Sequence, residues 1–241
     1  MSIFDKTVIT RKMKRTKFNL SYQNLLTCNM GSLVPIFCKE VLPNDTFSIS
    51  SSAFLRFAPM LKPIFSNIKT SIHFWYVPNR LVWKNWNKFI TGDKLDDGND
   101  PVQPYCVYAN GIARSTLADY LGLPANTLKF NETLGQFEEQ ININPNTKVS
   151  MLPFRAYALI WNNFYRDQEL QEEVPVSLED GLDTTTNKEL LNRAWRKDYF
   201  TSARPQAQYG DQVVVPIGDT APVYASNSMN SNLREKNALK F

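Results

Sequence analysis

The stretch IKTSIHFWYV, residues 68–77, predicts the fold class of this 241-residue chain more clearly than any other segment. Its alternate positions fall into two sets, which is the two-residue period of a β-strand. One set is mostly apolar or β-branched: Ile68, Thr70, Ile72, Phe74 and Tyr76. Pro78 ends the run, because proline cannot donate to a β-ladder. We therefore expect a strand here.

Strand patterns on both sides of this segment extend the same interpretation. Residues 33–57 contain two runs rich in apolar and β-branched residues, separated by PND at 43–45, which predicts two strands around a turn. VVVPI, residues 213–217, predicts a last short strand, and Pro216 favours an edge position. The connections run to tens of residues, which is too long for a regular hairpin meander. We expect a mainly β domain with elaborated loops.

Two short helical patterns interrupt the strands. Asn79 is the expected cap of a helix that Gly92 closes, with aromatic and apolar residues on one side: Trp83, Trp86 and Ile90. Residues 93–111 show no periodicity and are expected to form a long loop. Ser115 or Thr116 then caps a helix of barely two turns that stops at Gly122. Both helices are expected to be insertions between strands.

The best helical pattern follows Pro153 and ends at Pro175. Its apolar stripe consists of Tyr157, Ile160, Trp161 and Phe164. Residues 176–192 are polar and acidic, and the residues after 224 read as an unstructured or truncated tail.

The composition excludes several classes of protein. Hydrophobic residues make up 43% and charged residues 21%, as in ordinary soluble domains. No apolar run approaches the ~18 residues of a membrane span, and the N-terminus lacks a signal-like stretch, so we expect an intracellular chain. The single histidine and the three scattered cysteines, Cys28, Cys38 and Cys106, lack the close pairing of zinc ligands, so no metal or other cofactor is expected and the thiols are expected to be reduced.

The charge is unevenly distributed, although the net value is only +4. Residues 1–20 form a basic arm in which only Asp5 opposes six cations: Lys6, Arg11, Lys12, Lys14, Arg15 and Lys17. Residues 130–183 contain ten acidic side chains against three basic ones. We expect three parts: the arm (1–20), the main domain (21–223) and a polar tail (224–241).

Catalytic arrangements are not favoured by the sequence. His73, the only imidazole, lies in the predicted strand with no nucleophile motif nearby, so a packed or surface histidine is the better interpretation. The acidic pairs 138–139, 172–173 and 179–180 could suggest a glycosidase, but adjacent carboxylates point in different directions. No glycine-rich phosphate loop is present. We therefore do not expect an enzyme.

Two basic groups leave a binding role open. The arm, followed by Phe18 and Tyr22, has the composition of a single-stranded nucleic-acid contact, but a basic run of this kind is more often a solvated arm. A second group near residues 193–204 combines cations with aromatic residues and suits either phosphate or the acidic stretch of another copy. The tryptophans at 83, 86 and 161 fit a core, while the 12% aromatic content favours a large protein–protein interface.

Five blocks, in order, give the chain a family resemblance. They are FNLSYQNLLTCNMGSLVPI (18–36), VLPNDTF (41–47), FLRFAPMLKPIFSNIKTSIHFWYVPNRLVWKNWNKFITG (54–92), LPFRAYALIWNNFYRDQEL (152–170) and NRAWRKDYFTSARPQAQYGDQVVVPIG (192–218). The chain resembles the major capsid proteins of microviruses, specifically the gokushovirus branch of small single-stranded DNA phages. The fourth block carries the most specific similarity, and Asn44 stands where the family usually has glycine.

The resemblance implies a viral jelly roll, an antiparallel β-sandwich with helical insertions in long loops. It implies a structural subunit that assembles with copies of itself into a T=1 icosahedral capsid around single-stranded DNA, with other virion or scaffolding proteins as possible partners and no membrane. Such a subunit belongs to the virion and assembles in the bacterial cytoplasm. From the motif blocks we expect these interface residues: Trp83, Trp86, Trp161, Tyr165, Arg166, Trp195, Tyr199 and Phe200.

The family's chains are roughly twice as long, so the jelly roll is expected to be incomplete in this sequence. A fragment, a degraded prophage copy and one segment of a longer product all remain open as explanations. An incomplete sandwich leaves strand edges unpaired, so we expect the isolated chain to be insoluble or to pair through its edges. The alternative from another class is a soluble protein that binds single-stranded nucleic acid through the basic arm.

Overall fold

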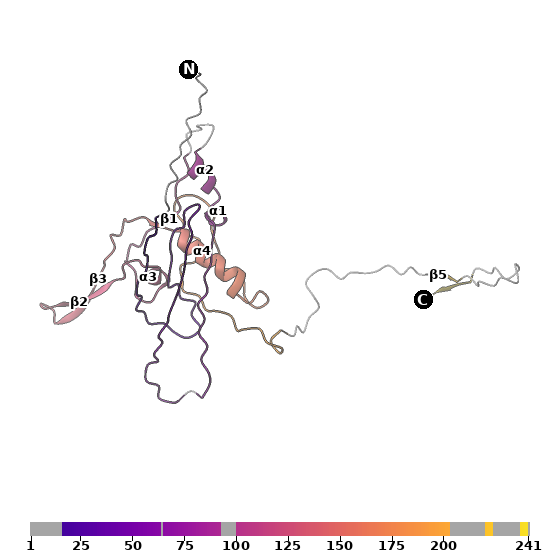
Figure 1. Ribbon diagram of the computed structural model, residues 1–241, viewed down its shortest axis with the longest axis horizontal. Helices are drawn as coiled ribbons and strands as arrows, with labels where there is room; N and C mark the ends of the chain where they lie inside the picture. Colours follow the sequence, from indigo (N-terminus) through magenta and orange to yellow (C-terminus); the bar gives the residue numbers. More distant parts are fainter. Residues whose placement is uncertain (1–15, 64, 93–99, 203–219, 224–236, 241) are drawn as a thin grey trace, which may run out of the picture. The chain divides into compact units, whose positions relative to one another are not determined.

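The structure is a computed structural model, and it describes residues 16–63, 65–92, 100–202, 220–223 and 237–240 (Figure 1). The chain divides into two compact units, Met1–Trp195 and Arg196–Phe241. The strands pair antiparallel in two-stranded sheets and the helices are short, which agrees with the mainly β expectation. None of the helices among the described residues has the length and apolar character that a membrane crossing needs.

The first unit holds most of the regular structure. Its helices are α1 (Asn79–Val82), α2 (Trp86–Thr91), α3 (Leu117–Tyr120), α4 (Leu152–Ile160) and the π-helical turn η1 (Trp161–Tyr165). Its strands are β1 (Tyr105–Cys106), β2 (Thr127–Asn131), β3 (Gln136–Gln140) and β4 (Val149–Ser150). In the second unit, β5 (Thr220–Val223) pairs with β6 (Asn237–Lys240).

The hydrophobic core of the first unit gathers around the start of α4. Strands β1 and β4 pair antiparallel beside it, and residues 181–183 run along the other edge of β1. The core side chains come from α3, α4, these strands and the intervening loops: Cys106, Ile112, Leu117, Ala118, Ile143, Val149, Met151, Phe154 and Tyr157. Since burial of apolar area is the main stabilising term, this cluster is the part of the described chain with the most stabilising packing.

Tyr157 connects the core to two distant segments. Its hydroxyl donates to the Leu33 carbonyl oxygen at 2.9 Å and accepts from the Leu191 N–H at 2.9 Å. The same two segments pair with each other, since the Leu33 N–H donates to the Leu191 carbonyl at 2.9 Å. Burial raises the pKa of Tyr157 to about 12, so the hydroxyl stays protonated and keeps its donor at neutral pH.

The helix that follows Pro153 is shorter than the pattern predicts. It changes to π geometry at Trp161, where the Arg166 N–H donates to the Trp161 carbonyl, five residues back, at 2.9 Å. The π turn ends at Tyr165, ten residues before Pro175. The wider turn shifts the buried face, so Tyr165 is 7% exposed while Phe164, assigned to the apolar stripe, is 59% exposed.

The predicted strand over residues 68–77 was wrong as a paired strand. The segment forms no strand in the structure, and burial does not follow the expected alternation: Phe74, Trp75 and Tyr76 are 50%, 42% and 75% exposed, although Trp75 also contacts Tyr165. The two strands expected within 33–57 were also wrong, because no ladder forms there. The turn between them is confirmed, with Asn44 at a φ of 67° and the Asp45 N–H donating to the Leu42 carbonyl. A strand needs a continuous ladder of hydrogen bonds with a neighbour, and within the described residues the contact of Leu33 with Leu191 does not extend into one.

The two short helices were predicted correctly, with adjustments. The helix expected over 79–92 is split into α1 and α2, Pro78 takes the cap position expected for Asn79, and Gly92 ends it with a φ of 72°. Helix α3 follows Thr116 and ends before Gly122, as expected.

Two loop expectations need correction. The loop expected over 93–111 contains β1, which is only two residues long and carries no period that a pattern could reveal. The tail was expected to be unstructured, yet residues 237–240 form β6. The strand expected at 213–217 lies outside the described residues.

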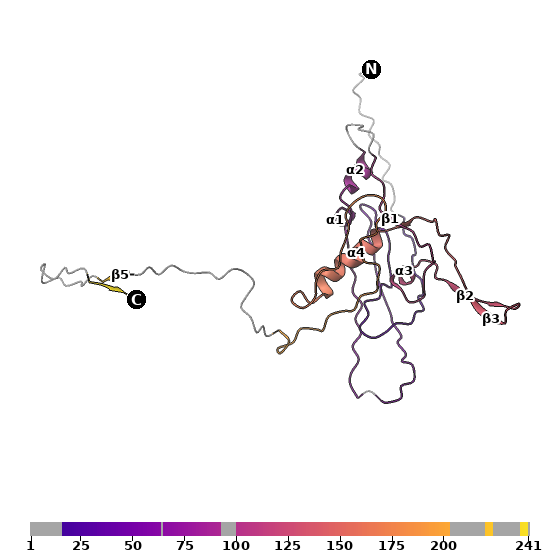
Figure 2. The ribbon, with the colours of Figure 1, turned by 180° about the vertical axis from the view of Figure 1, so that it is seen from behind.

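The sequence analysis missed the β2–β3 hairpin entirely. Five residue pairs align across it, from Thr127 opposite Gln140 to Asn131 opposite Gln136. Figures 1 and 2 show the hairpin extending away from α3 and α4. Its residues are almost all exposed. Because the hairpin does not pack against the core, its sequence lacks the long apolar pattern from which a strand is predicted.

Candidate assembly interface

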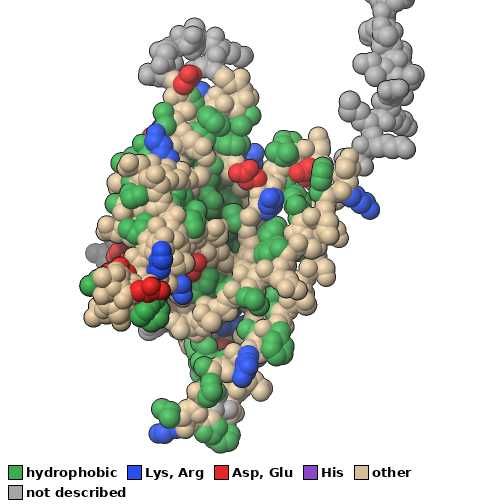
Figure 3. All heavy atoms as spheres, turned by 90° about the vertical axis from the view of Figure 1, so that its left-hand side faces the viewer, with side chains coloured by type: hydrophobic (Ala, Val, Ile, Leu, Met, Phe, Trp, Pro, Cys, Tyr) green, Lys and Arg blue, Asp and Glu red, His purple; other side chains and the backbone are tan. Residues whose placement is uncertain are grey.

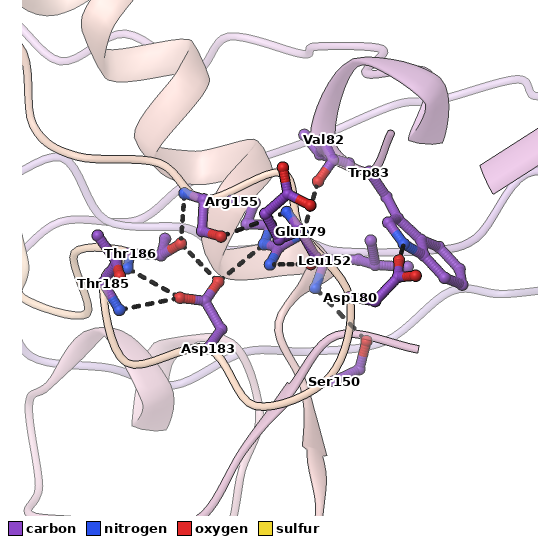
Figure 4. Close-up of polar contacts among 11 residues, drawn as sticks. Val82, Trp83, Ser150, Leu152, Arg155, Glu179, Asp180, Asp183, Thr185 and Thr186 are labelled. Carbon is purple, nitrogen blue, oxygen red and sulfur yellow. Dashed lines mark hydrogen bonds and ion pairs between the residues drawn. The ribbon is translucent and has the colours of Figure 1, made fainter. Parts of the chain in front are cut away.

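Arg155 is the buried polar centre of the first unit (Figure 4). Its Nε donates to Asp183 Oδ2 at 2.8 Å, and both side chains are fully buried. Its Nη1 donates to the Val82 carbonyl at 3.0 Å and its Nη2 to the Glu179 carbonyl at 2.9 Å. One guanidinium therefore joins α1, α4 and the loop at 179–183. Burying a charged pair costs desolvation free energy that hydrogen bonds must offset, and each of the three guanidinium nitrogens has an acceptor here.

Asp183 is held in its charged form by its neighbours. It accepts the Thr186 hydroxyl at 2.6 Å and the N–H groups of Thr185 and Thr186 at 3.1 and 2.9 Å. Burial alone would raise the pKa of this carboxyl, but the hydrogen bonds from Thr186 and the Arg155 guanidinium outweigh it and hold the pKa below its ordinary value of 3.8. The ion pair is therefore intact at neutral pH.

Asp180, in the same loop, anchors the aromatic helices. Its carboxylate accepts the Trp83 indole N–H and the Asn85 amide, the latter at 2.8 Å. Trp83 in turn packs against Trp86 and Phe89, with ring centroids 5.8 and 4.9 Å away. The loop at 178–183 thus fixes α1 and α2 against the core. These contacts give the Asp180 carboxylate a structural role.

The N-terminal part of the described chain contrasts with this core, because it exposes large apolar side chains over most of its length. We call residues 18–76 the exposed layer. Phe54, Phe65 and Leu25 are 93%, 97% and 96% exposed, and Leu61 is fully exposed. Figure 3 shows hydrophobic side chains spread over one face of the molecule and inside a hollow in it. Isolated exposed apolar residues are ordinary, but a contiguous stretch marks a surface that another polypeptide covers.

The structure separates the predicted interface residues into two groups. Trp83, Trp161 and Tyr165 are 0%, 5% and 7% exposed, so they pack inside the chain and present no surface to a neighbour. Arg166 is also largely covered, because it donates to the Gln171 carbonyl and pairs with Glu173 at 2.9 Å. The remaining four keep accessible area: Trp86 is partly buried, and Trp195, Tyr199 and Phe200 are more than 80% exposed. Those four stay candidates for subunit contact.

Of the six cations of the basic arm, Lys17 lies within the described residues, and it is exposed. Lys6, Arg11, Lys12, Lys14 and Arg15 lie outside the described residues. His73 is engaged structurally: its Nδ1 lies 2.5 Å from the Tyr165 hydroxyl, and its ring stacks on Tyr165. Within the described ranges, no three His, Cys, Asp or Glu side chains are grouped so that they could hold a metal ion, and all three cysteines are free thiols.

The sequence analysis missed the Arg155–Asp183 pair. One signal was available, because Arg155 stands alone as a charge within the otherwise apolar run LPFRAYALIW. A single cation inside an apolar helical stripe needs a buried partner. The identity of that partner, 28 residues away in an acidic loop, follows only from the fold.

A small buried core beside a long exposed apolar layer defines a class of protein: a subunit that completes its packing against other polypeptide. A family model described as "Capsid protein (F protein)" matches residues 6–240. The chain belongs to this family of phage capsid proteins.

Similar proteins point the same way. The chain is 36% identical over 219 residues to "Capsid protein VP1" of Bdellovibrio phage phiMH2K, and 36% identical over 233 residues to "Capsid protein VP1" of Chlamydia phage 1. A protein of the same name from Spiroplasma virus 4 is 27% identical over 223 residues. These matches cover 90%, 87% and 87% of this chain but only 38%, 36% and 37% of the relatives' lengths. All three names are those of structural proteins, not enzymes.

Proposed function

We propose that this chain works as a structural subunit of a T=1 icosahedral phage capsid that assembles from copies of itself and encloses single-stranded DNA. The observation that carries the proposal is the exposed layer: Phe54, Leu61 and Phe65 are each more than 90% exposed on a chain that buries Phe154 and Met151 in its core. Membership of the capsid family supports the structural role. In this proposal, assembly takes place in the host cytoplasm and no catalysis is involved.

The finer fold belongs to the same proposal. A jelly roll packs two antiparallel sheets face to face, so each inner face is apolar and covered by the other. Residues 33–77 carry strand-like alternation but find no ladder within the described chain. We propose that they become paired strands when further polypeptide, equivalent to what the longer relatives contain, lies against them.

The test is to express the chain, first alone and then together with polypeptide equivalent to the part of the longer relatives that it lacks. The products are examined by electron microscopy for assembled shells. Shells of uniform diameter that protect single-stranded DNA from nuclease support the proposal. A soluble monomer that binds oligonucleotide through the arm, and loses binding when Arg11, Lys12, Lys14 and Arg15 are neutralised, supports the nucleic-acid-binding alternative and contradicts the capsid role.

A further inference from the structure

The β2–β3 hairpin is strongly amphipathic. Residues opposite each other in the antiparallel register share a face, so the apolar residues Leu128, Phe130 and Phe137 lie on one side, together with Glu139 opposite Leu128. Phe130 and Phe137 form an edge-to-face pair with centroids 5.2 Å apart. The other side is wholly polar: Thr127, Lys129, Asn131, Gln136, Glu138 and Gln140. The apolar residues are 50–69% exposed, as is Leu134 in the turn at 62%. Apolar side chains gathered on one exposed face indicate a surface that makes contact with a partner.

The direction of the hairpin is set by a buried asparagine at its base. Asn126 is 5% exposed, and its side chain accepts the Ile112 N–H at 3.1 Å and donates to Glu139 on β3 at 3.0 Å. Gly111 makes room for it: a Cβ at that position would lie 2.1 Å from Asn126 Oδ1, and its φ is +74°. The hairpin is therefore fixed to the core and not a loose excursion.

The tip of the hairpin is also ordered. Asn131 Oδ1 accepts the N–H groups of Thr133 and Leu134 at 3.0 and 3.3 Å, and the Gly135 N–H donates to the Asn131 carbonyl at 2.9 Å. A hairpin with a fixed base and a rigid turn pays little entropy when it docks.

A groove of about 740 Å³ lies elsewhere on the same unit, between the start of the exposed layer and α3. Its apolar lining includes Leu25, Leu26 and Phe37, and Cys38, Lys39 and Arg114 also line it. The Tyr120 hydroxyl donates to the Thr27 carbonyl at 2.6 Å and holds the two walls together. The volume falls within the range of sites that accept a few large side chains.

Charge favours a match between these two surfaces. The hairpin carries Glu132, Glu138 and Glu139 against Lys129, so it is acidic. The groove carries Lys39 and Arg114 against Asp119, whose carboxylate already accepts the Ser115 N–H at 2.8 Å. The hairpin's own strands run five residues outward, roughly 16 Å, and the tip points away from α3 and α4 (Figures 1 and 2). The hairpin therefore extends away from the groove of its own chain, and the hairpin that fills the groove comes from a second molecule.

We propose that the hairpin of one copy inserts its tip, through the Leu134 side chain, into the groove between Leu25 and Arg114 of a second copy. This inference rests on the proposed function, since it names the partner in assembly. The contact joins two different patches, so it is heterologous, and repetition closes it into a ring around a rotation axis.

The experiment uses the native groove cysteine. In a Cys28→Ser background, Leu134→Cys is oxidised with copper phenanthroline and the products are separated on a non-reducing gel. A disulfide requires the two Cα atoms to approach within about 7 Å, so only a seated hairpin reacts with Cys38. We expect a ladder of covalent multimers, at least tenfold stronger than with the matched control Lys129→Cys on the polar face. Thr133→Cys serves as a second tip variant if Leu134→Cys fails to fold.

Removal of the groove thiol decides the assignment. The ladder should disappear with Cys38→Ser; multimers that persist would show tip-to-tip contact and overturn the proposal. Lys39→Glu should weaken the ladder, and adding Glu132→Lys should restore it. If electron microscopy shows shells while the ladder equals that of Lys129→Cys, this inference fails and the capsid function stands. Absence of both shells and multimers contradicts both.

Discussion

Phe154 and Phe54 have the same side chain and opposite environments. Phe154, on α4, is 1% exposed, because α4 shares a core with β4 and α3 and its neighbour Arg155 is tied to α1 and to the loop at 179–183. Phe54, in the exposed layer, is 93% exposed on a segment that forms no strand. The difference shows that hydrophobic sequence alone does not make a core. A core also needs backbone partners close at hand, and the α4 region has them within the chain while the exposed layer does not.

The largest loss of stability is expected when Arg155 is replaced. Arg155→Leu leaves the Asp183 carboxylate buried without its guanidinium, and losing one member of a buried pair costs about 3–5 kcal/mol. The measurement is urea unfolding followed by tryptophan fluorescence at sub-micromolar protein, where association is minimal. A loss below 1 kcal/mol would show that the pair does not hold the core together. The exposed-layer variant Leu61→Ser is the control.

A smaller loss is expected at the base of the hairpin. Gly111→Ala forces a left-handed φ on alanine and drives its Cβ into Asn126, and we expect a cost of about 2–3 kcal/mol. Gly122→Ala is the matched control, because its φ is also positive but no atom lies within 4 Å, so only the backbone strain of about 1 kcal/mol remains. Equal losses in the two variants would contradict the role assigned to Asn126.

Acid should weaken the core through Asp183. Its folded pKa lies below the ordinary value, so it contributes stability above the unfolded pKa of about 3.9, and that contribution is lost as the pH falls through the folded pKa. We expect the free energy of unfolding to fall as the pH drops below about 4. The slope should flatten in Asp183→Asn, which cannot titrate. An unchanged slope would place the acid sensitivity in other carboxylates.

The smallest effect on folding is expected in the exposed layer. Phe54→Ser and Leu61→Ser should change the free energy of unfolding by no more than about 0.5 kcal/mol, because these side chains are already in water. The same changes should raise the soluble, monomeric fraction measured by sedimentation velocity. A large loss of stability would show that the layer is folded against something within the chain. A wild-type chain that is itself a monodisperse, cooperatively melting monomer would contradict the expected edge pairing.

Much of the fold was predictable where the evidence was local. The short helix after Thr116, the turn at Asn44 and the stop at Gly92 each follow from one or two residues whose backbone preferences act within a few positions. Strand pairing was not predictable in this way. The alternation in IKTSIHFWYV describes which side chains face which way, but the ladder requires a neighbouring segment that the described chain does not provide.

The candidate interface residues show the same limit of local sequence signals. Trp83, Trp161 and Tyr165 carry family motifs, yet the structure buries them: Trp83 donates to Asp180, Trp161 donates to the Asn192 carbonyl, and Tyr165 stacks on His73. Trp195, Tyr199 and Phe200 carry the same kind of motif and remain exposed. An aromatic residue in a motif does not reveal whether the contact it serves is inside the chain or between chains.

The sequence by itself determined the family, through five ordered blocks, and the local signals of turns and helix ends, because those depend on residue identity and near neighbours. The tertiary structure alone decided which polar groups meet in the core, where Arg155 pairs with the Asp183 carboxylate and donates to the carbonyls of Val82 and Glu179. It also decided which apolar side chains stay uncovered, as on the β2–β3 hairpin and the exposed layer. Both depend on which distant segments the chain brings together, and burial energies accrue only once those segments are in contact.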